Sequence, residues 1–264
     1  MDTASTDQPE LLIEKTREIA TLILNRPRQR NALSRSLIAE TRQALADIDR
    51  DESIRLVILS GAGPAFCAGH DLKEIRANPD RAFLQGLFED CSAMMMAVQS
   101  IRQPVIARVH GIATAAGCQL VASCDLAVAA ADSHFATPGV NIGLFCSTPM
   151  VALSRAVPRK AAMEMLLTGE MVDAEKALGL GLINRIAPLD ELEAVTDDLA
   201  RTILSKSPVA LKIGKSAFYR QIEMGVEDAY DYVSQVMTEN MLERETEQGV
   251  DAFLTKQPPP WQKK

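Results

Sequence analysis

The chain has 264 residues, of which 47% are hydrophobic and 24% are charged, and its net charge is −7. This is the composition of a globular protein with a large core, so a disordered, collagen-like or coiled-coil chain is excluded beyond the termini. The acidic balance disfavours non-specific attraction to phosphate backbones, and no nucleic-acid partner is expected, although a local basic patch stays open.

The first residues, MDTASTDQPELLIEK, are acidic and lack both a basic segment and an apolar segment of the kind found in secretory signals. A cytoplasmic location is therefore predicted. The five cysteines are scattered through apolar contexts and indicate reduced thiols rather than a disulfide framework. No cysteine pair has zinc-finger spacing and the three histidines are dispersed, so no metal is expected.

Strands and helices alternate through the first two thirds of the chain. Residues 18–27 predict a strand that stops at Arg26-Pro27, and residues 30–51 predict a helix with one apolar face. Three further β-branched runs end in glycine or small residues and precede more helical segments: residues 55–61, 103–111 and 125–131. Repeated strand–turn–helix units predict an α/β fold whose loops carry the site.

Residues 135–154 carry no formal charge over a length that could span a membrane, but two prolines and two glycines interrupt them. We expect a buried loop and a helix start there, with no membrane insertion. From residue 190 three helical segments follow, over 190–206, 207–225 and 226–254. This appendage is either a lid or packing layer, or a subunit interface. The tail around Trp261 is expected to be extended.

Two small-residue turns are candidates for binding a ligand oxygen through backbone N–H groups. The segment GAGPAFCAGHDLKE, residues 61–74, lacks the third glycine of a dinucleotide-binding fingerprint but places Ala68-Gly69 at the entry to a helix. The segment GIATAAGCQLVASCD opens a second helix near Ala116. Two converging donors form an oxyanion hole, which stabilises negative charge on a carbonyl oxygen; from spacing alone, two ordinary helix starts remain the alternative.

Four segments occur in the order typical of the crotonase superfamily: RPRQRNALS, GAGPAFCAGHDLKE, the run from QPVIARVHG to VNIGL, and LLTGEMVDAEKALGLGLINRI. The chain resembles an enoyl-CoA hydratase/isomerase over nearly its whole length. The resemblance implies an α/β spiral of ββα units over residues 1–195 and a helical region over 196–264 that assembles homotrimers, commonly paired into hexamers.

The resemblance also implies a coenzyme A thioester as substrate or ligand, with no permanently bound cofactor. It assigns the two oxyanion N–H groups to Ala68 and Ala116. Basic residues of the NRPRQRNA turn would meet the phosphates of CoA. The residues expected to contact substrate or CoA are Arg28, Arg30, Ala32, Ala68, His70, Asp71, Leu72, Ala116, Pro138, Gly139 and Leu144.

Two positions depart from the family pattern. Hydratases of the family carry glutamates where this chain has Gln119 and Gly139, and these glutamates position water and move its protons. A glutamine does not take a proton at neutral pH, and a glycine contributes only backbone. Losing one acid–base group typically costs about a hundredfold to ten-thousandfold in rate, so weak or absent hydratase activity is predicted.

A replacement group is sought among nearby side chains. His70 is the best candidate because its ordinary pKa lies near neutrality; polar packing at the helix start is the alternative. Cys146 or Ser147 could act as a nucleophile only with an activating base, and Cys146 could equally be a buried small residue. Asp71 is expected to cap its loop and Asp125 to be structural.

The run Met94 to Met96 could line an acyl chain or belong to the core. Three functions stay open: an acyl-CoA-binding hydratase homologue with little hydration, different enolate chemistry such as decarboxylation assisted by His70, and a non-catalytic acyl-CoA-binding or regulatory protein.

Overall fold

A computed structural model describes residues 9–262 of the chain. Its main sheet has six strands in the order β1-β2-β3-β4-β6-β9, and only the β1–β2 pair is antiparallel. The strands are β1 (Leu11–Thr16), β2 (Ile19–Leu24), β3 (Leu56–Gly61), β4 (Val105–Val109), β6 (Leu126–Ala130) and β9 (Arg185–Ala187). The predicted α/β class is confirmed.

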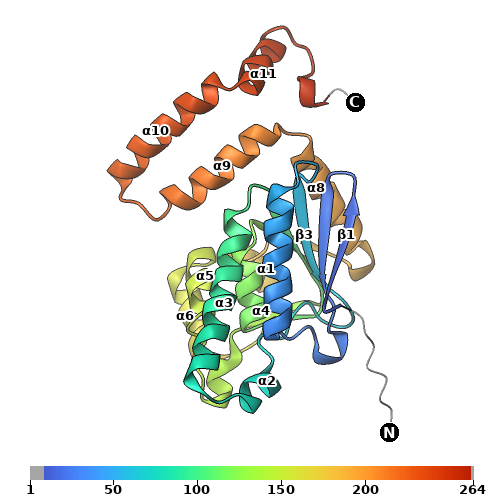
Figure 1. Ribbon diagram of the computed structural model, residues 1–264, viewed down its shortest axis with the longest axis vertical. Helices are drawn as coiled ribbons and strands as arrows, with labels where there is room; N and C mark the ends of the chain where they lie inside the picture. Colours follow the sequence, from blue (N-terminus) through green and yellow to red (C-terminus); the bar gives the residue numbers. More distant parts are fainter. Residues whose placement is uncertain (1–8, 263–264) are drawn as a thin grey trace.

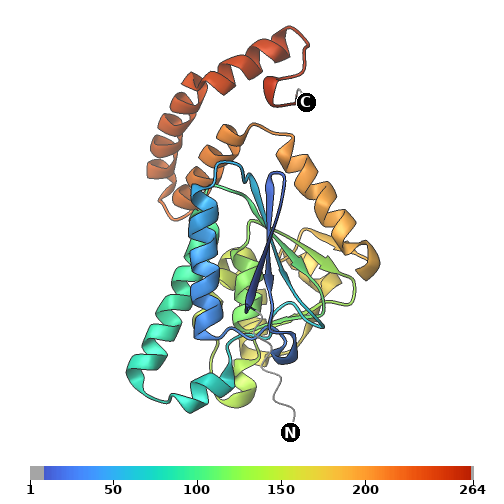
Figure 2. The ribbon, with the colours of Figure 1, turned by 45° about the vertical axis from the view of Figure 1, so that its right-hand side comes forward.

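Alternate residues of the strands enter two different apolar clusters. Val57 and Leu59 of β3 face the larger cluster, which α1 (Arg35–Arg50), α3 (Arg81–Ser100) and α4 (Ala116–Ser123) complete. Leu56 and Ile58 face the smaller cluster with α8 (Leu192–Leu204). A parallel sheet covered on both faces requires such continuous apolar strands. Figures 1 and 2 show α1 and α3 on one side of the sheet and α8 on the other.

A second sheet of three short strands, in the order β5-β7-β8, lies beyond the main one. It consists of β5 (Ile112–Thr114), β7 (His134–Ala136) and β8 (Val172–Asp173), with β5 and β7 parallel. Each short strand closely follows a long strand or precedes a helix, which gives the ββα repeat that the resemblance implied. The strand β5 leads almost directly into α4, which begins two residues after it ends.

The predicted first helix is confirmed as α1. Ser34 is its N-cap, and its hydroxyl accepts a hydrogen bond from the Leu37 N–H at 3.1 Å. The six predicted apolar-face residues are all buried: Leu37, Ile38, Thr41, Ala44, Leu45 and Ile48. The cap fixes where the helix begins, and the continuous apolar face packs it on the sheet.

Other short helices connect these elements. They are η1 (Pro27–Gln29), α2 (Leu72–Ala77), η2 (Pro138–Ile142), α5 (Pro149–Ala156), α6 (Arg159–Thr168), α7 (Ala174–Leu180) and η3 (Leu189–Glu191). The prediction of a buried loop within residues 135–154 is only partly confirmed. Ile142, Leu144 and Phe145 are exposed, because the chain bulges outward between η2 and α5.

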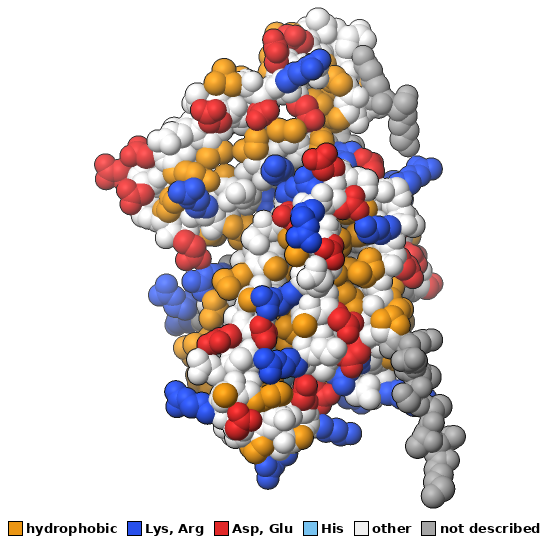
Figure 3. All heavy atoms as spheres, viewed as in Figure 1, with side chains coloured by type: hydrophobic (Ala, Val, Ile, Leu, Met, Phe, Trp, Pro, Cys, Tyr) orange, Lys and Arg blue, Asp and Glu red, His pale blue; other side chains and the backbone are white. Residues whose placement is uncertain are grey.

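The C-terminal helices form an arm that projects from one end of the body (Figures 1 and 2). It contains α9 (Pro208–Gln221), α10 (Val226–Leu242), α11 (Arg244–Leu254) and η4 (Pro260–Gln262). Among its described hydrophobic residues only Ala217 and Ala252 are buried. Figure 3 shows hydrophobic side chains gathered over these helices.

The prediction of helices in this region is confirmed, but the last segment divides at Glu243. The tail is not extended: residues 260–262 form a short 3-10 turn, and the Trp261 ring lies against Gly249. Within residues 9–262, no helix has the length and apolar character needed to cross a membrane.

Candidate functional site

The two predicted small-residue turns lie side by side. The Cys67 N–H donates to the Ile112 carbonyl at 3.1 Å, and the Thr114 N–H donates to the Cys67 carbonyl at 2.9 Å. The Thr114 hydroxyl also donates to the Ala68 carbonyl at 3.0 Å. These bonds attach the loop that follows β3 to the start of α4.

The prediction that Ala68 supplies an oxyanion N–H is wrong for this structure. The Ala68 N–H already donates to the Arg30 carbonyl at 2.9 Å. The next peptide turns over because Gly69 has a φ of +97°, in the region that favours glycine. The Gly69 N–H donates to the Cys67 sulfur, so the next donor to consider along the chain is that of the residue after Gly69.

His70 has that donor. The Gly69 carbonyl accepts a hydrogen bond from the Leu33 N–H at 2.7 Å, and the His70 N–H belongs to the same peptide. Because the C=O and N–H of a trans peptide point in opposite directions, the His70 N–H points away from Leu33. Neither this N–H nor that of Ala116 donates to an acceptor within residues 9–262. These two N–H groups lie on the two turns that the hydrogen bonds of Cys67 and Thr114 hold together.

The His70 side chain is held in an apolar setting. Its ring packs edge-on against Phe88 of α3, with the ring centroids 5.3 Å apart, and Nε2 is buried without a partner among the described residues. Burial lowers the pKa of His70 to about 4. The pKa therefore lies well below the ordinary value that made His70 a candidate acid–base group, and the imidazole is neutral at pH 7.

Gln119 lies one helical turn beyond Ala116 and is buried. Within residues 9–262, its Oε1 atom has no hydrogen-bond partner. Thr137, just before η2, is also fully buried, and its hydroxyl is likewise unpartnered in the part of the chain described. Thr137 was not among the residues predicted for the site, and it does not line the cavity described below.

Position 139, where the resemblance implies a glutamate in hydratases, has no room for a side chain. A Cβ atom at Gly139 would lie 2.3 Å from the Leu144 carbonyl oxygen and 2.9 Å from the Cys146 sulfur. The Leu144 N–H also donates to the Gly139 carbonyl at 2.9 Å. The loop after η2 therefore occupies the space where a glutamate side chain would begin.

Cys146 and Ser147 have little nucleophilic character here. Burial raises the pKa of the Cys146 thiol, so the thiol stays protonated at neutral pH. The Ser147 hydroxyl is exposed and donates only to the Phe145 carbonyl, at 3.4 Å. Neither side chain has an activating base among its described hydrogen-bond partners.

The turn that contains Arg28, Arg30 and Ala32 is fixed by Asn31. The Asn31 amide donates to the carbonyls of Ala62 and Ala65 at 2.8 and 2.7 Å, joining this turn to the loop after β3. Ala32 is buried, whereas Arg28 and Arg30 are exposed. Neither arginine forms an ion pair within residues 9–262, so both guanidinium groups can meet an anion.

Asp71 is engaged in holding the loop. Its Oδ1 accepts hydrogen bonds from the N–H groups of Lys73 and Glu74, as a cap of α2, and its Oδ2 pairs with Arg26 at 2.8 Å. Within residues 9–262, the other residues predicted to contact substrate or CoA form no hydrogen bond or ion pair with one another's side chains. Leu72 and Leu144 are about half exposed, and Pro138 opens η2.

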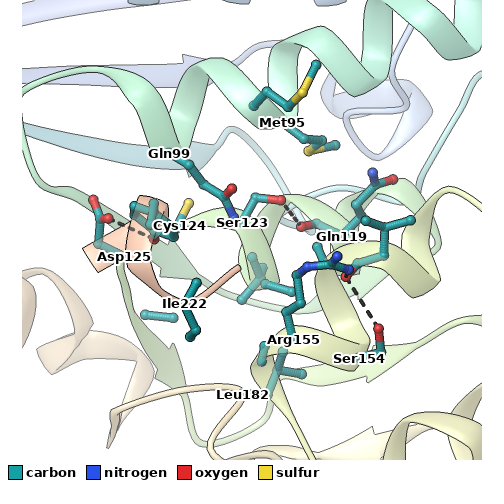
Figure 4. A pocket seen from close by; sticks show the side chains of 18 of the residues that line it. Met95, Gln99, Gln119, Ser123, Cys124, Asp125, Ser154, Arg155, Leu182 and Ile222 are labelled. Atoms are coloured by element: carbon teal, nitrogen blue, oxygen red, sulfur yellow. Dashed lines mark hydrogen bonds between the residues drawn. The ribbon is translucent and has the colours of Figure 1, made fainter. Parts of the chain in front are cut away.

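A cavity of about 950 Å³ lies between α3, α4, α5 and α9. Gln119 is the one predicted site residue on its wall, together with Met95 and Met96. Met94 and Met95 both belong to the core, whereas Met96 is exposed. Figure 4 shows Gln119 of α4, Arg155 of α5 and Ile222 around this space. Helix α4 therefore lines the cavity and also begins with Ala116, one of the two residues whose N–H is free.

Comparisons with known proteins point to one family over nearly the whole chain. A family model described as enoyl-CoA hydratase/isomerase matches residues 14–264. The mouse mitochondrial enoyl-CoA hydratase domain-containing protein 3 is 44% identical over 258 residues, covering 97% of this chain and 86% of the relative. The human protein of that name is 45% identical over 243 residues, covering 92% and 80%.

Solved structures of similar proteins superpose closely on this one. An enoyl-CoA hydratase from Mycobacterium smegmatis superposes with a TM-score of 0.95 at 51% identity, covering 96% of this chain and 99% of that one. The human domain-containing protein 3 superposes with a TM-score of 0.92 at 44% identity, covering 96% and 100%. The predicted crotonase fold is confirmed.

The predicted cytoplasmic location is contradicted, because these curated relatives are named mitochondrial. That prediction rested on the charge pattern of the first residues, and residues 1–8 lie outside those described. Local charge is a poor guide where the rest of the chain aligns with proteins of another compartment. The match over residues 14–264 and the identities of 44–45% show that the chain belongs to the enoyl-CoA hydratase/isomerase family.

Proposed function

We propose that this protein binds an acyl-CoA thioester and polarises its carbonyl between the N–H groups of His70 and Ala116. The observation that carries the proposal is the pair of N–H groups without acceptors on two adjoining turns. The Ala116 N–H also lies at the start of α4, where the helix dipole favours negative charge. Such donors stabilise the oxyanion that forms when a thioester is converted to an enolate.

Classical hydration is expected to be weak or absent. It needs a group that takes a proton from water and a group that returns one. Gln119 cannot ionise, Gly139 has no side chain, and the imidazole of His70 is neutral with a pKa of about 4. With two acid–base groups missing, each typically contributing about a hundredfold to ten-thousandfold, binding is retained while proton transfer is lost.

Calorimetry with CoA and crotonyl-CoA, together with the loss of enoyl-thioester absorbance, tests both statements. We expect binding of crotonyl-CoA without appreciable turnover. Ala116→Pro removes the N–H of residue 116 and should weaken thioester binding more than binding of CoA alone. Turnover within roughly tenfold of ordinary hydratases, or no affinity for any thioester, would contradict the proposal.

A second candidate is decarboxylation of a 2-carboxyacyl thioester, which the neutral surroundings of His70 favour. The substrate carboxylate leaves as CO₂, the electrons of its C–C bond enter the thioester to form an enolate, and water protonates the α-carbon. No protein base is required for the bond-breaking step. Release of CO₂ from malonyl-CoA or methylmalonyl-CoA supports this reaction, whereas binding of a broad thioester panel without turnover supports a binding or regulatory protein.

We also propose that the C-terminal arm joins copies of the chain into a trimer or hexamer. On α10, no residue is buried, and Tyr230, Met237, Met241 and Leu242 are at least half exposed. A helix with this much exposed apolar surface indicates an interface. Sedimentation should show an oligomer, and Met241→Asp should shift it toward monomer; a monomeric wild-type protein would contradict this.

A further inference from the structure

A buried ionic cluster attaches α9 to the end of α4. The Lys215 ammonium lies 2.7 Å from Asp125 Oδ2, and the Tyr219 hydroxyl donates to Asp125 Oδ1 at 2.9 Å. The side chains of Lys215 and Asp125 are only 6% and 16% exposed. Lys215 also donates to the carbonyls of Val98 and Gln103 at 2.9 and 2.8 Å, so every strong donor position of the ammonium is used.

Apolar packing does little to position α9. Ala217 is the only buried residue recorded for this helix, and Phe218 and Ile222 are more than half exposed. A buried ion pair adds little net stability compared with apolar contacts, but it defines geometry closely because a displaced partner leaves an uncompensated charge. The cluster of Asp125, Lys215 and Tyr219 therefore fixes where α9 lies.

The same helix lines the cavity opposite the candidate site. Phe218, Tyr219 and Ile222 face it from the C-terminal arm, while Gln119 and Val151 face it from the body. Arg155 also lines the cavity and pairs with Glu223 at 2.7 Å (Figure 4 labels Arg155 and Ile222). Asp125 lies two residues after the end of α4, so the cluster connects the cavity's far wall to the helix that begins with Ala116.

We propose that Asp125, Lys215 and Tyr219 are positioning residues that hold α9 as the far wall of an acyl-chain cavity and so determine the length of acyl group that the protein accepts. The inference rests on the proposed function, in which the thioester carbonyl is held at Ala116. A cavity of about 950 Å³ is at the upper end of the range for small-molecule sites, which fits medium-chain and long-chain acyl groups. A short acyl group does not reach α9 and is insensitive to its position.

Chain-length profiles of two variants test this. Calorimetry with CoA, acetyl-CoA, octanoyl-CoA and palmitoyl-CoA would be carried out on the full chain. Tyr219→Phe keeps the ion pair and removes one hydrogen bond to a charged group, and we expect palmitoyl-CoA to bind about tenfold more weakly with acetyl-CoA unchanged. Lys215→Met should have a larger effect of the same kind.

Matched controls are available on the arm itself. Lys212→Met alters an exposed lysine of α9, and Tyr230→Phe removes a hydroxyl from an exposed tyrosine of α10; both should keep the wild-type profile. Ile222→Trp reduces the cavity without touching the cluster and should weaken palmitoyl-CoA binding selectively. This variant keeps the test informative even if Lys215→Met does not fold.

The outcomes separate the two proposals. If the wild-type protein binds no thioester, the proposed function fails. If it binds thioesters but the Tyr219 and Lys215 variants lose affinity equally for all chain lengths, or change only the sedimentation of the oligomer, the cluster is merely structural and this inference alone is overturned. An unchanged profile for Ile222→Trp would show that acyl chains do not occupy the cavity.

Discussion

Replacing Gly139 by alanine measures how completely the loop after η2 has closed the second acid–base position. The new Cβ would lie 2.3 Å from the Leu144 carbonyl oxygen, whereas ordinary contact begins at 3.4 Å, so the loop must move by about 1 Å. That shift also disturbs the Leu144 N–H to Gly139 carbonyl bond of 2.9 Å. Overpacking of this kind costs about 1–3 kcal/mol of unfolding free energy.

Urea denaturation followed by circular dichroism, at one protein concentration, supplies the measurement. Gly214→Ala in α9 is the matched control, because a Cβ there meets nothing within 4 Å. Since alanine is the better helix former, Gly214→Ala should raise the unfolding free energy by about 0.4–1 kcal/mol. Equal stability of the Gly139→Ala and Gly214→Ala variants would refute the steric reasoning.

Three further predictions follow from the site and its supports. Above pH 6.5 His70 is neutral in both the folded and the unfolded chain, whereas between pH 6.5 and about 4 only the unfolded chain takes up a proton at this residue. The free energy of unfolding should therefore fall by roughly 3 kcal/mol between pH 6.5 and 4. The variant His70→Phe should show a weaker pH dependence in urea titrations. Gln119→Glu with Gly139→Glu should not restore hydration of crotonyl-CoA, because the second carboxylate has no room; a rate gain of about a hundredfold would contradict this. Ser34→Ala removes the cap of α1 and should cost about 1 kcal/mol by denaturation, with Ser36→Ala, on the exposed first turn, as the control.

The elements that position the site could be predicted because each has its own local signal. The β3 run LVILSG is apolar on both faces and ends in glycine, and α1 has a cap and a six-residue apolar face. The meeting of the loop after β3 with the start of α4 came from the family resemblance. The cap at Asp71 was also predictable, because an aspartate before a helical run satisfies the first free N–H groups.

The identity of the N–H donors, the pKa of His70 and the partners of Asp125 could not be predicted, because they depend on backbone turns and contacts of the folded chain. The choice of His70 over Ala68 as donor depends on the φ of Gly69, which turns over one peptide. The low pKa of His70 depends on burial beside Phe88, eighteen positions along the chain. Asp125 was expected to be structural, but its partners Lys215 and Tyr219 are about 90 residues away.

Two parts of the site respond differently to substitution. The free N–H groups of His70 and Ala116 are backbone groups, so they persist while the fold and the turn at Gly69 persist, whatever side chains surround them. Proton transfer depends on side chains, and at position 139 the neighbouring loop has filled the space that a carboxylate needs. A single substitution therefore cannot reverse that loss. Under the proposed function, the two backbone donors polarise a thioester carbonyl while Gln119 and Gly139 supply no carboxylate, which suits binding of thioesters or a reaction in which substrate and water supply the electron pair and the proton.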